Sequence, residues 1–115
     1  MSHERENPYR TTTCATLRPD HVGQTVRLAG WVNRKRDHGQ LLFIDLRDHY
    51  GVTQCVFTPD SPAFAAAESV RLESGISVAG KVIRRDPENV NPALPTGHVE
   101  LAVESVDVLS AADTL

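Results

Sequence analysis

The chain has few aromatic residues, two cysteines and no long hydrophobic segment. Aromatic side chains make up 5% of its 115 residues, and no apolar run approaches the roughly 18 residues expected of a membrane-spanning helix. Cys14 and Cys55 fit no zinc-binding spacing, so we expect buried free thiols in a reducing cytosol. The polar N-terminus, mixed in charge, is not that of a signal peptide. These features favour one cytoplasmic domain with a single core.

Sequence motifs for catalysis and for metal binding are also missing. The five histidines are scattered without the spacing of a metal pair, and no Ser or Cys lies in a nucleophile motif. No glycine-rich phosphate loop follows a predicted strand. We therefore expect no catalytic residue, no metal site and no cofactor within these 115 residues.

Basic residues are absent from the end of the chain. No Lys or Arg follows Arg85, and residues 86–115 carry six acidic side chains. Twelve basic against nine acidic residues give residues 1–85 a net charge of +3, although the whole chain carries −3. Within residues 27–47, two acidic residues accompany five cations, namely Arg27, Arg34, Lys35, Arg36 and Arg47. Such a patch favours contact with a few phosphates over broad affinity for polyanions; the alternative is a solvated strand end.

Hydrophobic alternation predicts five β-strands. They cover residues 25–32, 41–47, 52–57, 76–84 and 99–108, the last with a bulge near Ser105. One helix is predicted over residues 62–72, with Ser61 as N-cap and Gly75 at its end. A shorter helical turn is expected near residues 13–17.

The order of these elements predicts the fold. Five strands with one helix between the third and the fourth match the OB-fold, an all-β Greek-key barrel. Periodicity alone leaves an SH3-like barrel or a sandwich open. We assign residues 10–115 to this domain and residues 1–9, which lack a hydrophobic pattern, to a flexible tail. Gly30 predicts a bulge or bend, and the neighbouring Trp31 is expected in the core.

The segment 41–47 is the clearest strand, with an aliphatic face and a mixed face. Its mixed face carries Phe43 between charged residues. Residues 48–51 form a turn in which Gly51 can adopt a positive φ. We expect the hairpin to pair Asp45 with Gln54 and Phe43 with Val56, because a slip of one residue would bury Gln54 without a partner.

An exposed Phe43 beside a cationic cluster predicts binding of single-stranded nucleic acid, for which we favour a loop of RNA. Cations hold phosphates and an exposed ring stacks on an unpaired base. Gln54 can hydrogen-bond to a base edge or serve only as a surface residue. From the sequence pattern alone, Glu100 is expected to be a surface residue. A general single-strand-binding domain and a protein-binding barrel remain alternatives.

The run GWVNRKRDHG at residues 30–39, followed by LFIDLRD at residues 42–48, closely resembles the N-terminal domain of bacterial aspartyl-tRNA synthetases. Further matches are HVG at 21–23, GVTQ at 51–54, GKV at 80–82, TG at 96–97 with Glu100, and ADTL at 112–115. The resemblance covers the chain after residue 9. Asparaginyl and lysyl enzymes share the fold and remain competitors, but RKRDHG favours the aspartyl type.

The resemblance implies an OB-fold that binds the tRNA anticodon loop. It implies that Phe43 stacks on the central U, that Gln54 recognises this base and that Glu100 contacts the first anticodon position. Arg34 and Arg36 would hold phosphates or bases of the loop. Weaker phosphate contacts are expected from Lys35, Arg47 and Arg85.

His38 occupies the position at which, by the same resemblance, enzymes restricted to tRNA(Asp) often have Leu and those that also charge tRNA(Asn) tend to have His. The two anticodons differ at the third base, so a side chain near that base can set discrimination. We therefore expect relaxed specificity, with a solvated loop histidine as the alternative.

The chain stops at Leu115, about where the hinge to a catalytic domain should begin. The resemblance implies a parent aspartate–tRNA ligase of class II, a homodimer that binds ATP and Mg²⁺ in that catalytic domain. We expect this fragment to bind tRNA(Asp), and tRNA(Asn) if specificity is relaxed, to be monomeric, and not to aminoacylate.

Overall fold

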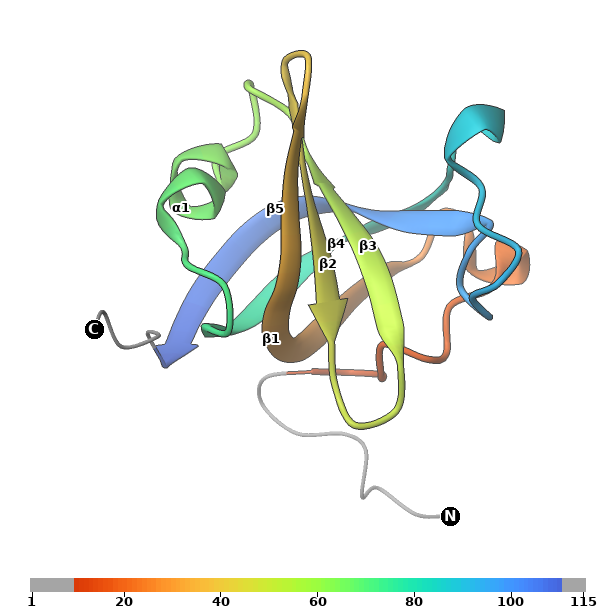
Figure 1. Ribbon diagram of the computed structural model, residues 1–115. Coiled ribbons are helices and arrows are strands. Elements are labelled where there is room, and N and C mark those ends of the chain that lie inside the picture. Colours follow the sequence, from red (N-terminus) through yellow and green to blue (C-terminus); the bar gives the residue numbers. More distant parts are fainter. Residues whose placement is uncertain (1–9, 111–115) are drawn as a thin grey trace.

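The alternating segments form a closed five-stranded barrel in the computed structural model, which describes residues 10–110 (Figure 1). The strands are β1 (Thr25–His38), β2 (Leu41–Arg47), β3 (Val52–Phe57), β4 (Gly75–Arg84) and β5 (Val99–Ser110). Their order around the barrel is β1-β2-β3-β5-β4. Only β3 and β5 pair in parallel among these neighbours. This topology confirms the predicted OB-fold. The predicted N-terminal tail and the ADTL match lie outside the described residues.

The described residues also form three short helices. Helix α1 (Phe64–Ser69) lies between β3 and β4 in the sequence, η1 (Pro19–His21) precedes β1, and η2 (Pro87–Asn89) lies in the loop between β4 and β5. In Figure 1, α1 and this loop lie on opposite sides of the β2–β3 hairpin. None of the helices in residues 10–110 has the length and apolar character needed to cross a membrane.

The core is built from the aliphatic face of each strand. In β2, Leu42, Ile44 and Leu46 are almost fully buried. Side chains from all four other strands complete the core, among them Leu28, Val32, Phe57, Ile76, Val78, Val82, Leu101 and Val103. Cys14 and Cys55 are buried free thiols, as predicted, and burial raises the pKa of both.

The hairpin between β2 and β3 has the predicted register, with Asp45 opposite Gln54 and Phe43 opposite Val56. Asp48 closes the turn, because its Oδ1 accepts the N–H groups of Tyr50 and Gly51 at 2.8 and 2.9 Å. The positive φ expected at Gly51 is wrong. Gly51 instead lies against Ala15, whose Cβ would be 3.0 Å from any added Cβ.

Strand β1 is longer than predicted, because the cationic run continues it as far as His38. The bulge lies at Asn33, between the pairs Val32–Leu46 and Arg34–Asp45, and not at Gly30. Gly30 serves a close approach, since an added Cβ would stand 2.2 Å from the Arg47 carbonyl oxygen. The bulge predicted near Ser105 is confirmed by the register shift of β5 against β4.

Three further local expectations are corrected. Helix α1 is shorter than predicted, and its N-cap is Ala63 and not Ser61. Ser61 Oγ instead accepts the Ala63 N–H at 3.2 Å and donates to the Val103 carbonyl oxygen at 2.9 Å in the turn before the helix. Residues 13–16 form a single turn, closed by the Thr16 N–H and the Thr13 carbonyl oxygen at 3.2 Å, and helical geometry starts only at Pro19. Trp31 is half-buried outside the core, with its ring 5.5 Å from that of His49.

Candidate nucleic-acid interface

The predicted site residues meet on one surface, which we call the outer face. Paired residues of antiparallel strands share a face, so the pairs Arg34–Asp45, Arg36–Phe43 and Asp45–Gln54 place five side chains together on β1, β2 and β3. Glu100 of β5 joins them through a hydrogen bond to Gln54. The face of β2 and β3 is the ligand-binding surface common to OB-folds.

The bulge at Asn33 decides which cations reach the outer face. Val32 is buried in the core, so an unbroken strand would turn Arg34 and Arg36 inward and Lys35 outward. The extra residue reverses this alternation. Arg34 and Arg36 therefore join Phe43 on the outer face, while Lys35 points toward α1.

Phe43 is only 4% exposed, so the expectation of an open ring is wrong. The ring lies outside the hydrophobic core cluster. The Arg36 guanidinium carbon lies 5.3 Å from the ring centroid, a cation–π contact. The His38 ring lies at 6.4 Å in an edge arrangement. Two predicted site residues, Arg36 and His38, thus contact the Phe43 ring.

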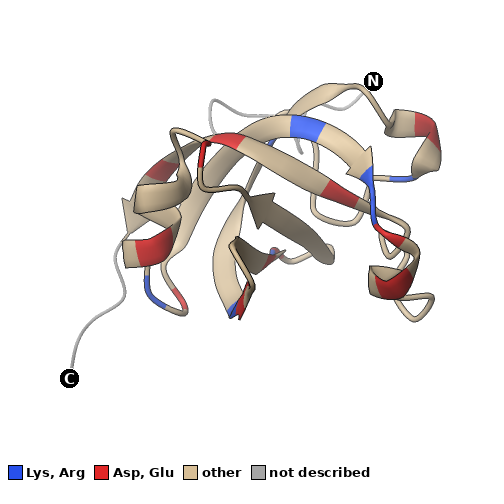
Figure 2. Ribbon diagram, turned by 90° about the horizontal axis from the view of Figure 1, so that it is seen from above, with Lys and Arg blue, Asp and Glu red and all other residues tan. Residues whose placement is uncertain are grey.

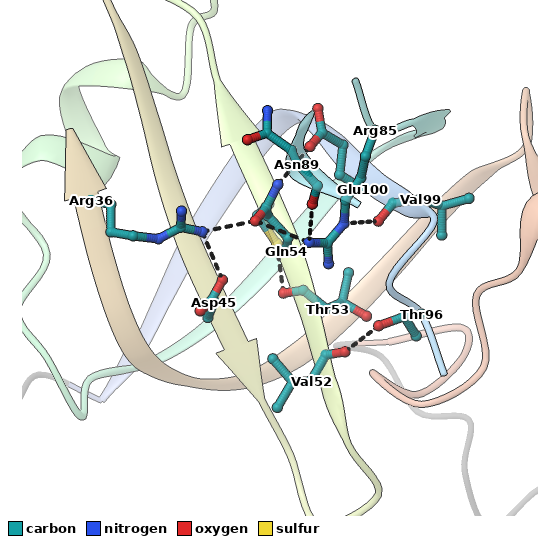
Figure 3. A network of polar contacts seen from close by, with 11 residues as sticks. Arg36, Asp45, Val52, Thr53, Gln54, Arg85, Asn89, Thr96, Val99 and Glu100 are labelled. Atoms are coloured by element: carbon teal, nitrogen blue, oxygen red, sulfur yellow. Dashed lines mark hydrogen bonds and ion pairs between the residues drawn. The ribbon is translucent and has the colours of Figure 1, made fainter. Parts of the chain in front are cut away.

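Gln54 is the centre of a polar network (Figure 3). Its Oε1 accepts from Arg36 Nη2 at 2.8 Å and from Arg85 Nη1 at 3.3 Å. Its Nε2 donates to Glu100 Oε1 at 2.7 Å. Arg36 Nη2 also lies 3.4 Å from Asp45 Oδ1. Donors on one side and an acceptor on the other fix the orientation of the Gln54 amide.

Glu100 is 7% exposed, which makes it a buried partner of Gln54 and not a surface residue. Burial raises the pKa of Glu100, while the hydrogen bond from Gln54 and the charge of Arg85 oppose that rise. A buried carboxylate needs such partners to remain ionised. In this arrangement Glu100 holds Nε2 of Gln54, so that Oε1 faces the arginines.

Arg85 anchors the loop at residues 85–98 to the network. Its Nε donates to the Val99 carbonyl oxygen at 2.8 Å, and its Nη1 donates to the Asn89 carbonyl oxygen at 3.1 Å (Figure 3). Burial lowers the pKa of Arg85, and Glu100 counteracts that effect. The side chain is buried, so the geometry does not support the phosphate contact expected of it.

A polar pocket of about 250 Å³ opens between this network and the 85–98 loop. Arg34, Arg36, Asp45, Gln54 and Arg85 line it, together with Glu88, Asn89, Asn91 and Leu94 of the loop. The four loop residues were not predicted as site residues. The sequence indicates here only a loop that contains two Asn. It does not place this loop beside Gln54, because that position depends on the contact of Arg85 with Asn89.

A larger hollow of about 530 Å³ lies beside Trp31 and His49. It shares no residue with the polar pocket, and none of the predicted site residues lines it. Its wall carries one arginine, Arg10, with the acidic Asp48 and Glu73, whereas three arginines accompany the two acidic residues of the polar pocket. The polar pocket, although smaller, therefore has the better chemistry for nucleic acid.

Fewer than five of the cations in the predicted patch are available on the outer face. Lys35 Nζ donates to the carbonyl oxygens of Glu68 and Val70 at 3.0 and 2.7 Å, so its expected phosphate contact has no support. Arg27 pairs with Asp107 at 3.4 Å. Arg34 and Arg47 are exposed and have no ion pair with another described residue. Figure 2 shows basic and acidic residues interspersed along the barrel.

Comparison with known proteins gives this geometry a family. Residues 26–109 match the tRNA anticodon family, which is described as an OB-fold nucleic acid binding domain. The chain belongs to this family. The match covers β2, β3, β4 and nearly all of β1 and β5, so the outer face and the polar pocket both lie within it.

Two relatives are similar over 93% of the chain. The aspartate–tRNA(Asp/Asn) ligase of Acidiphilium cryptum is 63% identical and that of Sinorhizobium medicae is 62% identical, and in each the chain spans 18% of the relative's length. The solved asparaginyl-tRNA synthetase of Pyrococcus horikoshii is 30% identical, with a TM-score of 0.74 over 88% of this chain and 23% of that one. The predicted resemblance is thus confirmed.

Proposed function

We propose that this chain is the anticodon-binding domain of an aspartate–tRNA ligase that serves tRNA(Asp) and tRNA(Asn). The carrying observation is the outer face, where Phe43, Arg36, Gln54 and Glu100 form one contiguous network within the matched family domain. An aromatic ring beside oriented hydrogen-bonding groups suits a splayed-out base of an RNA loop.

Each outer-face residue has a distinct role in the proposal. Phe43 stacks on the central anticodon base and Gln54 recognises the edge of that base. Arg34, exposed at the rim of the polar pocket, contacts phosphate, and Arg36 contacts phosphate or base. Arg47 is exposed and adds a weaker phosphate contact.

In this proposal Glu100 orients Gln54. It contacts the first anticodon base only if the edge of that base reaches into the network. Arg85 likewise acts by position, since it joins Gln54 to the loop residue Asn89. The pocket beside them provides space for a second base. Its polar lining suits the hydrogen-bonding edges of a base.

His38 is proposed to relax the choice between the two tRNAs. It is exposed, and its ring lies next to Phe43, so it lies near any base stacked on Phe43. Both relatives named above are Asp/Asn ligases. The two anticodons differ at one base, and one residue near that base is enough to set or remove a preference.

The remaining activity belongs, in this proposal, to the part of the ligase that the chain does not span. That part, more than four-fifths of the relatives' length, would bind ATP and Mg²⁺, attach aspartate and form the homodimer. The 115-residue chain alone would bind tRNA as a monomer without aminoacylating it. No group of three or more His, Cys, Asp or Glu in residues 10–110 is arranged to hold a metal.

The test is a low-salt titration of the chain with three RNA stem-loops that carry GUC, GUU or a scrambled anticodon. We expect GUC and GUU to bind more tightly than the scrambled loop, and nearly equally to each other. Equal binding to all three would indicate a general single-strand-binding domain. A strong preference for GUU alone would favour an asparaginyl type, and absence of binding would contradict the proposal.

A further inference from the structure

Phe43 cannot accept a base in the arrangement that the structure shows. Stacking requires an open ring face, but Phe43 is 4% exposed. Two side chains of β1, Arg36 and His38, contact the ring, and Val56, opposite Phe43 on β3, lies beside it on the same face. Because His38 meets the ring in an edge arrangement and Arg36 lies over the ring, Arg36 is the side chain that a stacked base must displace.

Arg36 also occupies the hydrogen-bonding position of a base. Its Nη2 donates to Gln54 Oε1 at 2.8 Å. One N–H of Gln54 Nε2 is bonded to Glu100, and Oε1 is the atom of Gln54 at which departure of Arg36 frees a position for a ligand. A single guanidinium therefore covers the ring and uses the acceptor, the two features that the proposed function assigns to one base.

Asp45 is the acidic residue that holds Arg36 in this position. Its Oδ1 lies 3.4 Å from Arg36 Nη2, and the pair is partly exposed. Asp45 lies on β2 two residues after Phe43 and directly opposite Gln54. The carboxylate therefore attracts the guanidinium toward the Phe43 ring and the Gln54 amide at once.

We infer that Arg36 closes the anticodon site of the free domain and that Asp45 is the positioning residue that keeps it closed. The inference rests on the proposed function, since it explains how a covered Phe43 becomes a stacking surface. RNA binding exchanges Arg36 for a base on both Phe43 and Gln54 Oε1. The displaced Arg36 is then free to pair with a phosphate of the same loop.

The closed arrangement leaves a buried donor without a hydrogen-bond partner on each arginine that reaches Gln54, Nε of Arg36 and Nη2 of Arg85. A buried donor without a partner carries a desolvation cost, and the cost at Arg36 is relieved when Arg36 moves out toward water or phosphate. The closed state is thus held mainly by groups that a base and a phosphate can replace.

The exchange also imposes a chemical requirement on the incoming base. When Arg36 leaves, Gln54 Oε1 loses its closest donor, and Arg85 at 3.3 Å is the other one. A base that brings an N–H to Oε1 restores the lost bond, whereas a base that presents an acceptor there leaves Oε1 poorly satisfied. Opening therefore favours bases with a donor at that edge.

The test compares Asp45→Asn with Glu88→Gln in the 115-residue chain. Both substitutions remove one negative charge from the lining of the polar pocket, but no contact joins Glu88 to Arg36 among the described residues. With the GUC stem-loop, we expect Asp45→Asn to raise the association rate constant about two- to fivefold above that of Glu88→Gln, the size expected for loss of one exposed ion pair. A rate or affinity below that of Glu88→Gln would overturn the inference, because Asp45 would then support the bound state.

A second measurement follows the cover directly. NMR should show through-space contacts between Arg36 and the Phe43 ring protons in the free chain, and these contacts should weaken in Asp45→Asn and disappear in the complex with the GUC loop. Contacts that persist in the complex would overturn the inference. Thermal unfolding of both variants checks that the fold is retained.

The two proposals fail in different ways. If wild type binds GUC, GUU and scrambled loops equally, the proposed function fails. If wild type prefers GUC and GUU but Asp45→Asn weakens binding, or Arg36 stays on Phe43 in the complex, the proposed function stands and the inference fails.

Discussion

The two faces of β2 are buried by different means. On the inner face, Leu42, Ile44 and Leu46 pack among aliphatic side chains of the core. On the outer face, Phe43 is buried almost as fully, but a guanidinium and an imidazole contact its ring. A bound RNA cannot replace the aliphatic contacts of the core, whereas a base and a phosphate can replace cation–π and hydrogen-bonding contacts. The inner face therefore provides stability, and the outer face provides a surface that can exchange partners.

The largest expected contrast comes from shortening one side chain on each face. Ile44→Ala removes buried methyl groups from the core and should lower the free energy of unfolding by about 2–5 kcal/mol. Leu41→Ala, on the partly exposed outer side of the same strand, should cost less than half as much. Denaturant unfolding measures both, and equal losses would contradict the distinction between the faces.

Phe43→Ala tests the outer face through binding. Loss of a stacked base should weaken binding of the GUC stem-loop by about 1–3 kcal/mol, while the circular dichroism spectrum stays that of a folded barrel. Tyr50→Ala is the matched control, because Tyr50 is an aromatic residue, 43% exposed, at the tip of the β2–β3 hairpin. If both variants lose the same affinity, binding would not depend on the outer face.

Arg34→Ala and Lys35→Ala compare adjacent cations that point to different sides of the barrel. Arg34→Ala should reduce by about one the slope of log affinity against log salt concentration, the effect of one lost phosphate contact. Lys35→Ala should leave the slope unchanged but lower stability by about 0.3–1 kcal/mol, because Lys35 binds the carbonyl end of α1. A changed slope in Lys35→Ala would mean that Lys35 does contact a phosphate of the RNA.

Glu100→Gln should change how stability depends on pH. Burial raises the pKa of Glu100 above the usual 4.5, so the folded state binds this proton more tightly than the unfolded state. Ionisation of Glu100 then disfavours folding as pH rises through 4.5 and through the higher folded-state pKa. The variant lacks this ionisation but keeps an oxygen that can accept from Gln54 Nε2.

The expected result is a Tm difference, variant minus wild type, that increases between about pH 3.5 and 7. Thermal melts at several pH values measure it. A constant difference would mean that the network and burial offset each other in the pKa of Glu100, and a decreasing difference would mean that the network lowers this pKa more than burial raises it.

The sequence was sufficient for the inner face and for the hairpin register. Alternation in β2 identified the residues that face the core, and Gln54 could occupy only one face without loss of its hydrogen bonds. The covering of Phe43 could not be predicted, because its cover comes from Arg36 on a neighbouring strand. Nor could the roles of Glu100 and Arg85, since their burial depends on β5 and the 85–98 loop closing over Gln54.

The sequence by itself therefore determined the barrel, its core and the residue types of the outer face, because hydrophobic alternation and turn residues act locally. Only the tertiary structure decided which cations take part. The bulge at Asn33 turns Arg34 and Arg36 toward Phe43 and sends Lys35 to α1. No local pattern in RKR marks that shift, because a bulge depends on how β1 pairs with β2.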